Sequence, residues 1–318
     1  MRILLAIDGS PSSIQARDLV AGLRWPAATT IRLATVCEPP MDWSGGLGAG
    51  MAWLGDAEDE LSATLGAELG RLAEPLAGHD WQIERRVVPG RPATAIIDAA
   101  RQFGADLVVI GSRGRGPLTS MLLGSVSAEV VEHAPCSVLV ARGNHIARLL
   151  VATDGSAVAR MIPDVLGQLG VFGGLPAEAL SVSPLPERTF ELLADVYTLG
   201  AYDFTEERQE LLDRHRGFAD ELARRLVDHH IPATSSVAEG DATHEIVEAA
   251  RRRGSDLIVT GTRGLRGVER ALLGSVARNV LIHAHCSVMV TRGKRSPDGK
   301  AGGHEGDAAD AAPEPGRP

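Results

Sequence analysis

The sequence predicts an α/β protein of two tandem domains, each built on a parallel sheet with helices on both faces. Three observations support this fold class. The chain has 318 residues, more than one ordinary domain of about 100 to 150 residues needs. Its second half repeats its first, and each half alternates strand-like with helical stretches. Hydrophobic residues make up 44% and aromatic residues only 3%, so the cores must be mainly aliphatic, which suits buried parallel strands.

The internal repeat defines the domain organisation. Residues 87–142 align with residues 237–292 at a constant offset of 150, with 26 identities in 56 positions. The opening RILLAIDGS at 2–10 returns as RLLVATDGS at 148–156, at an offset of 146. The second copy has therefore gained four residues in its less similar first half. We expect domains over residues 1–143 and 147–293, variable stretches at 38–58 and 184–206, and a disordered tail over 294–318, which is rich in Gly, Pro, Ala and acidic residues.

Short runs rich in branched aliphatic residues predict the strands, in chain order. In the first copy they are ILLAI (3–7), IRLATV (31–36), WQIERRVV (81–88), DLVVIG (106–111) and SVLVAR (137–142). Helical stretches lie between them at 12–23, 57–77, 92–103 and 125–133, and Pro92 suits the first turn of the third. In the second copy the strand-like runs are 149–153, 178–182, 233–239, 256–261 and 287–292. This βαβ alternation favours a parallel sheet with right-handed crossovers.

Composition excludes several classes of function. A formal charge of −9 gives no general attraction to nucleic acid. Three cysteines without a C-x-x-C motif indicate a reducing compartment rather than a disulfide or zinc framework. The apolar run at the start is too short for a signal peptide, and no segment approaches the ~18 apolar residues of a membrane span. We therefore expect a cytoplasmic protein that binds neither nucleic acid nor membrane.

The segment IGSRGRGPLTSMLLGSVS, from Ile110 to Ser127, is the most informative motif. A buried strand runs into Gly111, Gly114 follows after two residues, and Gly124-Ser125 opens the next helix after nine more. The second copy has the same spacing in Gly261, Gly264, Gly274 and Ser275. Glycines at a strand end let backbone amides approach a ligand, and a helix N-terminus attracts anions. The pattern predicts a phosphate site in each half, with Ser125 and Ser275 as helix N-caps that also face phosphate.

These residues resemble the universal stress protein family, whose nucleotide-binding members carry G-x2-G-x9-G-[ST]. Both copies match that pattern in full, and the resemblance covers about residues 1–143 and 147–293. It implies two Rossmann-like domains of the adenine nucleotide alpha hydrolase type, each with a five-stranded parallel sheet in the order 3-2-1-4-5. In that fold ATP lies across the carboxyl ends of strands 1 and 4, where the order reverses, as expected for a ligand at a topological switch point.

The resemblance also implies a role for individual residues. Asp8 and Asp154 would lie near the ribose and the magnesium-bound phosphates, and Val36 and Val182 would read adenine through the backbone. The ribose would lie against Gly111 and Gly261. The remaining positions would hold the phosphates and close the pocket floor: Gly114, Gly124, Ser125 and Val126, with Gly264, Gly274, Ser275 and Val276. Arg113 and Arg263 add a possible charge contact to phosphate. A turn role alone remains an alternative for each aspartate, because Asp-Gly-Ser suits turns.

The sequence favours a nucleotide-binding protein over an enzyme. It has no Walker loop or nucleophile elbow, and its only lysines, Lys294 and Lys300, lie in the tail. We expect an ATP-binding stress or signalling protein with at most slow hydrolysis and an unidentified signalling partner. The alternatives are a genuine ATPase or nucleotidyl-transferring enzyme, and a scaffold with empty sites. The resemblance further implies intramolecular pairing of the domains through their last strands, and it suggests a homodimer of chains.

Overall fold

The computed structural model describes residues 1–38, 51–78, 80–114, 123–184, 205–262 and 273–293. Each repeat contributes five strands at or within two residues of the predicted positions. In the first repeat these are β1 (Arg2–Ala6), β2 (Thr30–Cys37), β3 (Gln82–Pro89), β4 (Leu107–Gly111) and β5 (Ser137–Ala141). In the second they are β6 (Leu149–Thr153), β7 (Ala177–Ser183), β8 (Ala233–Glu239), β9 (Leu257–Gly261) and β10 (Ser287–Thr291).

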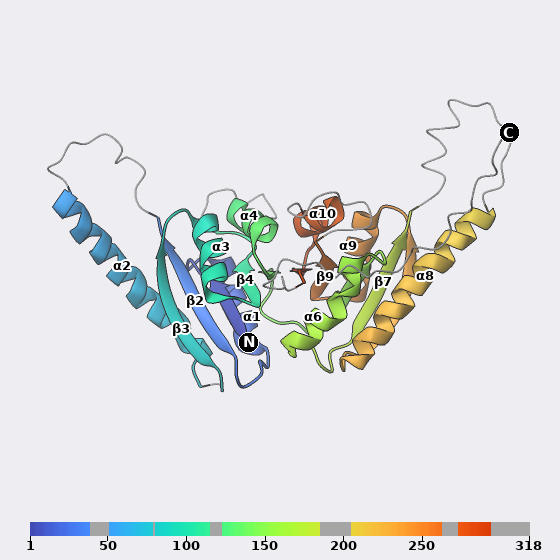
Figure 1. The fold of residues 1–318 in the computed structure, drawn as a ribbon, viewed down its shortest axis with the longest axis horizontal. Coiled ribbons are helices and arrows are strands. Elements are labelled where there is room, and N and C mark those ends of the chain that lie inside the picture. The colour runs from blue at the N-terminus through green and yellow to red at the C-terminus, as the bar shows by residue number, and fades with distance from the viewer. Residues whose placement is uncertain (39–50, 79, 115–122, 185–204, 263–272, 294–318) are drawn as a thin grey trace, which may run out of the picture.

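All ten strands form one continuous sheet, in the order β3-β2-β1-β4-β5-β10-β9-β6-β7-β8. Within each repeat the strands are parallel and follow the order 3-2-1-4-5. The two halves join through their last strands, which pair antiparallel with Val140 opposite Val288 and Val138 opposite Val290. The expected domain pairing is therefore present, and it merges the two five-stranded sheets into one (Figure 1).

Helices cover both faces of the sheet (Figure 1). The first repeat has α1 (Pro11–Gly22) and α2 (Met51–Ala73), with a 3-10 turn at Glu74–Leu76, on one face, and α3 (Pro92–Phe103) and α4 (Ser125–His133) on the other. The second has α5 (Ala157–Arg160), α6 (Ile162–Leu169) and α8 (Thr205–Asp228) opposite α9 (Ala242–Arg253) and α10 (Ser275–His283). Helix α3 begins at Pro92, as predicted, and Gly104 ends it in a left-handed conformation with φ 64°.

The second repeat splits the counterpart of α1 into two pieces. Helix α5 ends at Arg160, and α6 begins at Ile162 with Pro163 in its first turn. Counting back 146 residues, Pro163 corresponds to Arg17 in the middle of α1. Because proline lacks the amide hydrogen and its ring clashes with the preceding turn, it is tolerated only where a new helix begins.

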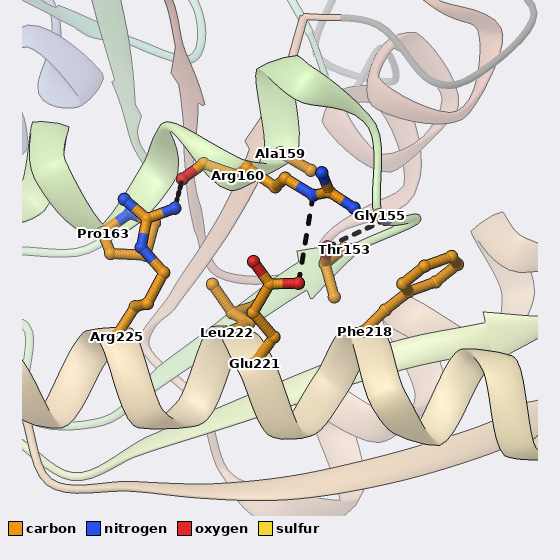
Figure 2. Close-up of a pocket in the computed structure, with 9 residues that line it drawn as sticks. All are labelled: Thr153, Gly155, Ala159, Arg160, Pro163, Phe218, Glu221, Leu222 and Arg225. Carbon is orange, nitrogen blue, oxygen red and sulfur yellow. Dashed lines mark hydrogen bonds and ion pairs between the residues drawn. The ribbon is translucent and has the colours of Figure 1, made fainter. Parts of the chain in front are cut away.

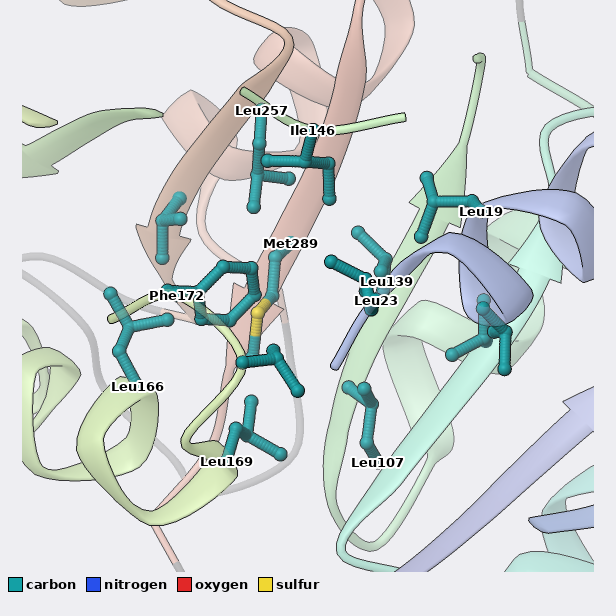
Figure 3. Packing of buried hydrophobic residues seen from close by; sticks show 14 of the residues in the cluster. Leu19, Leu23, Leu107, Leu139, Ile146, Leu166, Leu169, Phe172, Leu257 and Met289 are labelled. Atoms are coloured by element: carbon teal, nitrogen blue, oxygen red, sulfur yellow. The ribbon is translucent and has the colours of Figure 1, made fainter. Parts of the chain in front are cut away.

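Two apolar clusters, one on each face of the sheet, run across the boundary between the repeats. On the α1 and α8 face, Leu139 and Leu107 of the first repeat belong to the same cluster as Met289 and Phe172 of the second (Figure 3). The largest fully buried side chains are Phe172 and a set of Leu and Ile residues, which agrees with the aliphatic composition. This shared core fixes the carboxyl ends of the parallel strands, where the predicted site residues lie.

The structure leaves several predictions open. The tail over 294–318 and most of the two variable stretches, at 39–50 and 185–204, lie outside the described residues. In the part of the chain that is described, no helix is both long and apolar enough to span a membrane.

Candidate functional site

Asp8 follows β1 in a tight turn that leads into α1. The Ser10 amide donates to Asp8 Oδ1 at 3.0 Å, and the Asp8 amide donates to Ser13 Oγ at 3.3 Å. Gly9 between them has φ 76°, which favours glycine. Ser10 caps the helix by accepting from the Ser13 amide. The turn role considered for this aspartate is therefore real, and it fixes one carboxylate oxygen in place.

The second repeat builds the same turn at Asp154. The Ser156 amide donates to Asp154 Oδ1 at 3.0 Å, and Ser156 Oγ accepts from the Ala159 amide at 3.3 Å. Gly155 has φ 75°, within a degree of Gly9. Both aspartates are half-buried. The two turns thus present a carboxylate at equivalent places, at the carboxyl ends of β1 and β6.

The glycine loop of the first repeat folds against the Asp8 turn. A Cβ added to Gly114 would lie 3.1 Å from Asp8 Oδ2, and Ser10 Oγ donates to the Arg113 carbonyl at 3.3 Å. The carboxylate after β1 and the loop after β4 therefore meet where the strand order reverses, as the family resemblance implied.

Packing between β4 and α1 also requires glycine at position 111. It is buried, and a Cβ there would lie 2.6 Å from the Ser12 carbonyl carbon and 2.7 Å from the Ser13 nitrogen. Its missing side chain therefore lets the start of α1 lie directly on β4. Gly261 ends β9 at the equivalent place.

The predicted N-caps are wrong by one residue. Gly124 and Gly274 are the N-caps, with extended backbones, and Ser125 and Ser275 are the first helical residues. The cap position is fixed because the Gly124 amide donates to the Ser112 carbonyl at 2.7 Å, and the Gly274 amide to the Thr262 carbonyl at 2.7 Å. Neither serine hydroxyl forms a hydrogen bond within the described part of the chain, and both serines are exposed.

The remaining predicted residues divide between core and surface. Val36, Val126, Val182 and Val276 are half-buried and pack against the core on the α3 and α9 face. Arg113 is exposed beside the loop. Arg263 and Gly264 lie outside the described residues. Among the described residues, no group of three or more His, Cys, Asp or Glu side chains could hold a metal ion, so a metal at Asp8 or Asp154 would need most of its ligands from phosphate and water.

Two pairs of equivalent residues near the sites have structural roles. Burial raises the pKa of Cys136 to about 12 and that of Cys286 to about 11, which suits apolar core residues and not nucleophiles. His133 and His283 end α4 and α10, where a positive charge is favourable.

A polar cluster that the sequence motifs did not predict lies near the Asp154 turn. His215 of α8 is buried, and its Nδ1 lies 2.8 Å from Ser181 Oγ on β7. The sequence signal that could have found His215 is its place on the buried stripe of α8 with Ala219, Leu222, Ala223 and Leu226.

A shallow hollow lies beside His215, between α5, α6 and α8. Its volume is about 220 Å³, part of which is open to solvent, and Gly155, Arg160 and Phe218 form part of its lining (Figure 2). Only about 10 Å³ of it can be reached by the centre of a water-sized sphere, about the room that one water molecule needs.

The fold and the site define a tandem Rossmann-like α/β protein, with a carboxylate beside a glycine loop at the switch point of the first repeat and an equivalent carboxylate turn in the second. The chain belongs to the universal stress protein family, whose sequence model matches residues 1–142 and 145–292.

Curated relatives agree with this assignment. Universal stress protein MJ0531 of Methanocaldococcus jannaschii is 33% identical over 148 residues, which are 46% of this chain and 71% of that protein. Universal stress protein Rv2005c of Mycobacterium tuberculosis is 28% identical over 242 residues, covering 70% of this chain and 74% of that protein.

Solved structures show the same fold over almost the whole chain. A universal stress protein from Archaeoglobus fulgidus has a TM-score of 0.60 at 19% identity, covering 93% of this chain and 97% of that one. A putative universal stress protein from Pseudomonas aeruginosa has a TM-score of 0.53 at 19% identity, covering 91% and 92%.

Proposed function

We propose that this chain binds ATP with Mg²⁺ at one site per domain, and that occupancy of the sites tunes an interaction or assembly in a stress response. The observation that carries the proposal is the meeting of Asp8 with the Gly114 loop directly beside the start of α4. A helix N-terminus beside glycine amides favours a phosphate group. The carboxylate nearby suits a ribose hydroxyl or a magnesium ion.

The start of α4 lies against the glycine loop. A Cβ on Gly124 would be in ordinary contact, at 3.4 Å, with Arg113 Cα and the Ser112 carbonyl oxygen. Ser125 follows with an exposed hydroxyl and a first-turn amide that has no partner within the helix. These groups would donate to phosphate, and Arg113 would add a positive charge.

Roles for the other predicted residues follow the family resemblance. Mg²⁺ is commonly held by one or two carboxylates together with phosphates and water, and Asp8 and Asp154 would each supply one. Bound Mg²⁺ would neutralise phosphate charge. The second site would use Asp154, Val182, Gly261, Arg263, Gly264, Gly274, Ser275 and Val276 as the first uses Asp8, Val36, Gly111, Arg113, Gly114, Gly124, Ser125 and Val126.

Assembly would have to use a surface other than the last strands. In the family resemblance these strands are the usual pairing surface, but here β5 and β10 already pair within the chain. A homodimer of chains would therefore form through another face, and the edges of the sheet are β3 and β8. We place the protein in the cytoplasm, because a reducing compartment suits three free cysteines.

Nucleotide content tests the proposal directly. Freshly purified protein is denatured, and the released nucleotide is identified and counted by chromatography and mass spectrometry. We expect up to two ATP per chain, one fewer in Asp8→Ala and in Asp154→Ala, and none in the double variant. Release of no nucleotide, together with no thermal shift on adding ATP and Mg²⁺, would support a scaffold. Turnover of ~1 s⁻¹ or faster would support an ATPase instead.

A further inference from the structure

The two aspartate turns differ in what lies beneath them. In the second repeat, His215 and Phe218 of α8 lie three residues apart on one helix face and reach the end of β6. Their rings meet edge to face, with centroids 5.5 Å apart at an interplanar angle of 75°. The residues around Asp154 thus receive direct support from α8, which packs on the same face of the sheet as α5 and α6.

A chain of hydrogen bonds runs from His215 to the residue before Asp154. Ser181 Oγ donates to the Thr153 carbonyl at 2.9 Å and lies 2.8 Å from His215 Nδ1. A hydroxyl has a single proton, so both contacts are hydrogen bonds only if Nδ1 carries a proton and donates to Ser181. Burial, together with Arg214, lowers the pKa of His215 despite the opposing charge of Asp154, which favours the neutral imidazole, and the two contacts of Ser181 place its proton on Nδ1.

Phe218 supports the other side of the same turn. A Cβ on Gly155 would lie 2.5 Å from the nearest ring carbons of Phe218, so the ring packs directly on the backbone beside Asp154 (Figure 2). The Gly155 amide in turn donates to Thr153 Oγ1 at 3.2 Å. Helix α8 therefore contacts the turn through both a polar chain and an aromatic ring.

The first repeat lacks the residues for this arrangement. Counting back 150 residues along the helix, Leu65 stands in place of His215 and Glu68 in place of Phe218. This register matches the buried positions, since Leu69 and Ala73 correspond to Ala219 and Ala223.

The first turn is held from its own helix instead. Its Asp8 amide donates to Ser13 Oγ, whereas the counterpart of Ser13 is Ala159, which has no hydroxyl. In the first repeat the turn is supported by α1, the helix that follows it. In the second repeat the turn is supported by α8.

We propose that His215 is a positioning residue for Asp154, acting through Ser181 and Thr153, so that the two nucleotide sites are inequivalent and only the second depends on α8. This inference rests on the proposed nucleotide function. It predicts that changes in α8 alter ATP affinity at the second site and leave the first unchanged.

Calorimetric titration with Mg·ATP in an Asp8→Ala background isolates the second site. There His215→Leu, which introduces the residue of the first repeat, is expected to weaken binding about tenfold, the effect of losing one buried hydrogen bond. His215→Asn is expected to stay within about threefold, because its amide donates from the position of Nδ1. Rescue by asparagine separates positioning of the turn from simple packing.

Ser181→Ala keeps the test valid if His215→Leu does not fold. It should lose as much Mg·ATP affinity as His215→Leu. The double variant should bind no more weakly than either single variant, because each of them breaks the same series of hydrogen bonds. Leu65→Ala at the equivalent position of α2 is the matched control and should leave second-site affinity unchanged.

The outcomes distinguish failure of this inference from failure of the proposed ATP binding. If the wild-type protein binds no Mg·ATP, the proposed function fails. If Asp154→Ala protein binds but Asp8→Ala protein does not, the second site is not a nucleotide site, and the inference is overturned while nucleotide binding at the first site stands. Equal affinity of the His215→Leu and His215→Asn proteins for Mg·ATP would also overturn it.

Discussion

Arg142 and Arg292 occupy equivalent positions 150 residues apart. Each donates to the carboxyl end of the helix that follows the glycine loop in the other repeat. Arg292 Nη2 donates to the Val131 and Glu132 carbonyls of α4, both at 2.6 Å. Arg142 donates to the Leu281 carbonyl of α10, and Leu281 is the counterpart of Val131. Each helix that begins at a proposed phosphate site therefore ends against a guanidinium from the other domain. The helix dipole favours an anion at the first end and a cation at the second.

Removing the Arg292 contact should lower the free energy of unfolding by weakening the interface between the two repeats. Arg292→Leu leaves carbonyls of α4 without their charged donor, and we expect a loss of about 2 to 3 kcal/mol. Urea unfolding followed by circular dichroism measures it.

The control for that change is Arg278→Ala. It breaks the 2.9 Å ion pair with Glu132, also between the repeats, but the Arg278 side chain is 55% exposed. A loss below about 1 kcal/mol is expected. Similar losses for the two variants would contradict the role given to Arg292.

Gly111→Ala should destabilise the first domain whether or not nucleotide is present. The new methyl group would lie 2.6 Å from the backbone of Ser12, and forcing α1 away from β4 costs about 1 to 3 kcal/mol. Gly143→Ala is the control, since a Cβ there meets no described atom within 4 Å. The thermal midpoints of the two variants, measured without ligand, should differ clearly; equal midpoints would rule out the packing explanation.

Gly114→Ala should affect binding more than stability. Gly114 is exposed, but its Cβ would lie 3.1 Å from Asp8 Oδ2 and would shift the carboxylate. We expect first-site ATP affinity, measured by calorimetry in an Asp154→Ala background, to fall about tenfold. Gly66→Ala in α2 has open space around the new methyl group and should leave affinity unchanged. Unaltered affinity in Gly114→Ala would remove this loop from the proposed site.

The buried thiols should make stability fall at alkaline pH. Burial raises the pKa of Cys136 to about 12 and that of Cys286 to about 11, from an ordinary value of 9.0. Above pH 9 the unfolded chain loses these protons while the folded protein keeps them, so the free energy of unfolding decreases as pH rises from about 9 to 11. Urea midpoints at pH 8, 9 and 10 measure the fall, which should be smaller in the Cys136→Ala/Cys286→Ala variant.

Alkylation gives an independent check. At pH 8 iodoacetamide should modify the partly exposed Cys37 of the native protein and leave Cys136 and Cys286 intact. Denatured protein should react at all three cysteines, as mass spectrometry would show. Rapid labelling of Cys136 in native protein would contradict its burial.

Much of the fold could be predicted because its signals are local. Strands 149–153 and 233–239 coincide with β6 and β8, and helix 92–103 with α3, since aliphatic runs, Pro92 and Gly104 act within a few residues of themselves. The N-cap of α4 was misplaced because the Gly124 amide is held by Ser112, twelve residues earlier. Propensity favours serine at such a position, and a contact outside the helix decides otherwise.

The sequence by itself determined the repeat, the alternation of strands and helices, and the glycine spacing that marks each candidate site. Only the tertiary structure decided that Asp8 lies against Gly114, and that His215 lies beneath the Asp154 turn with no counterpart in the first repeat. The physical reason is distance along the chain. Periodicity and turn chemistry depend on neighbouring residues, whereas these contacts join residues dozens to more than a hundred positions apart and depend on which faces pack together.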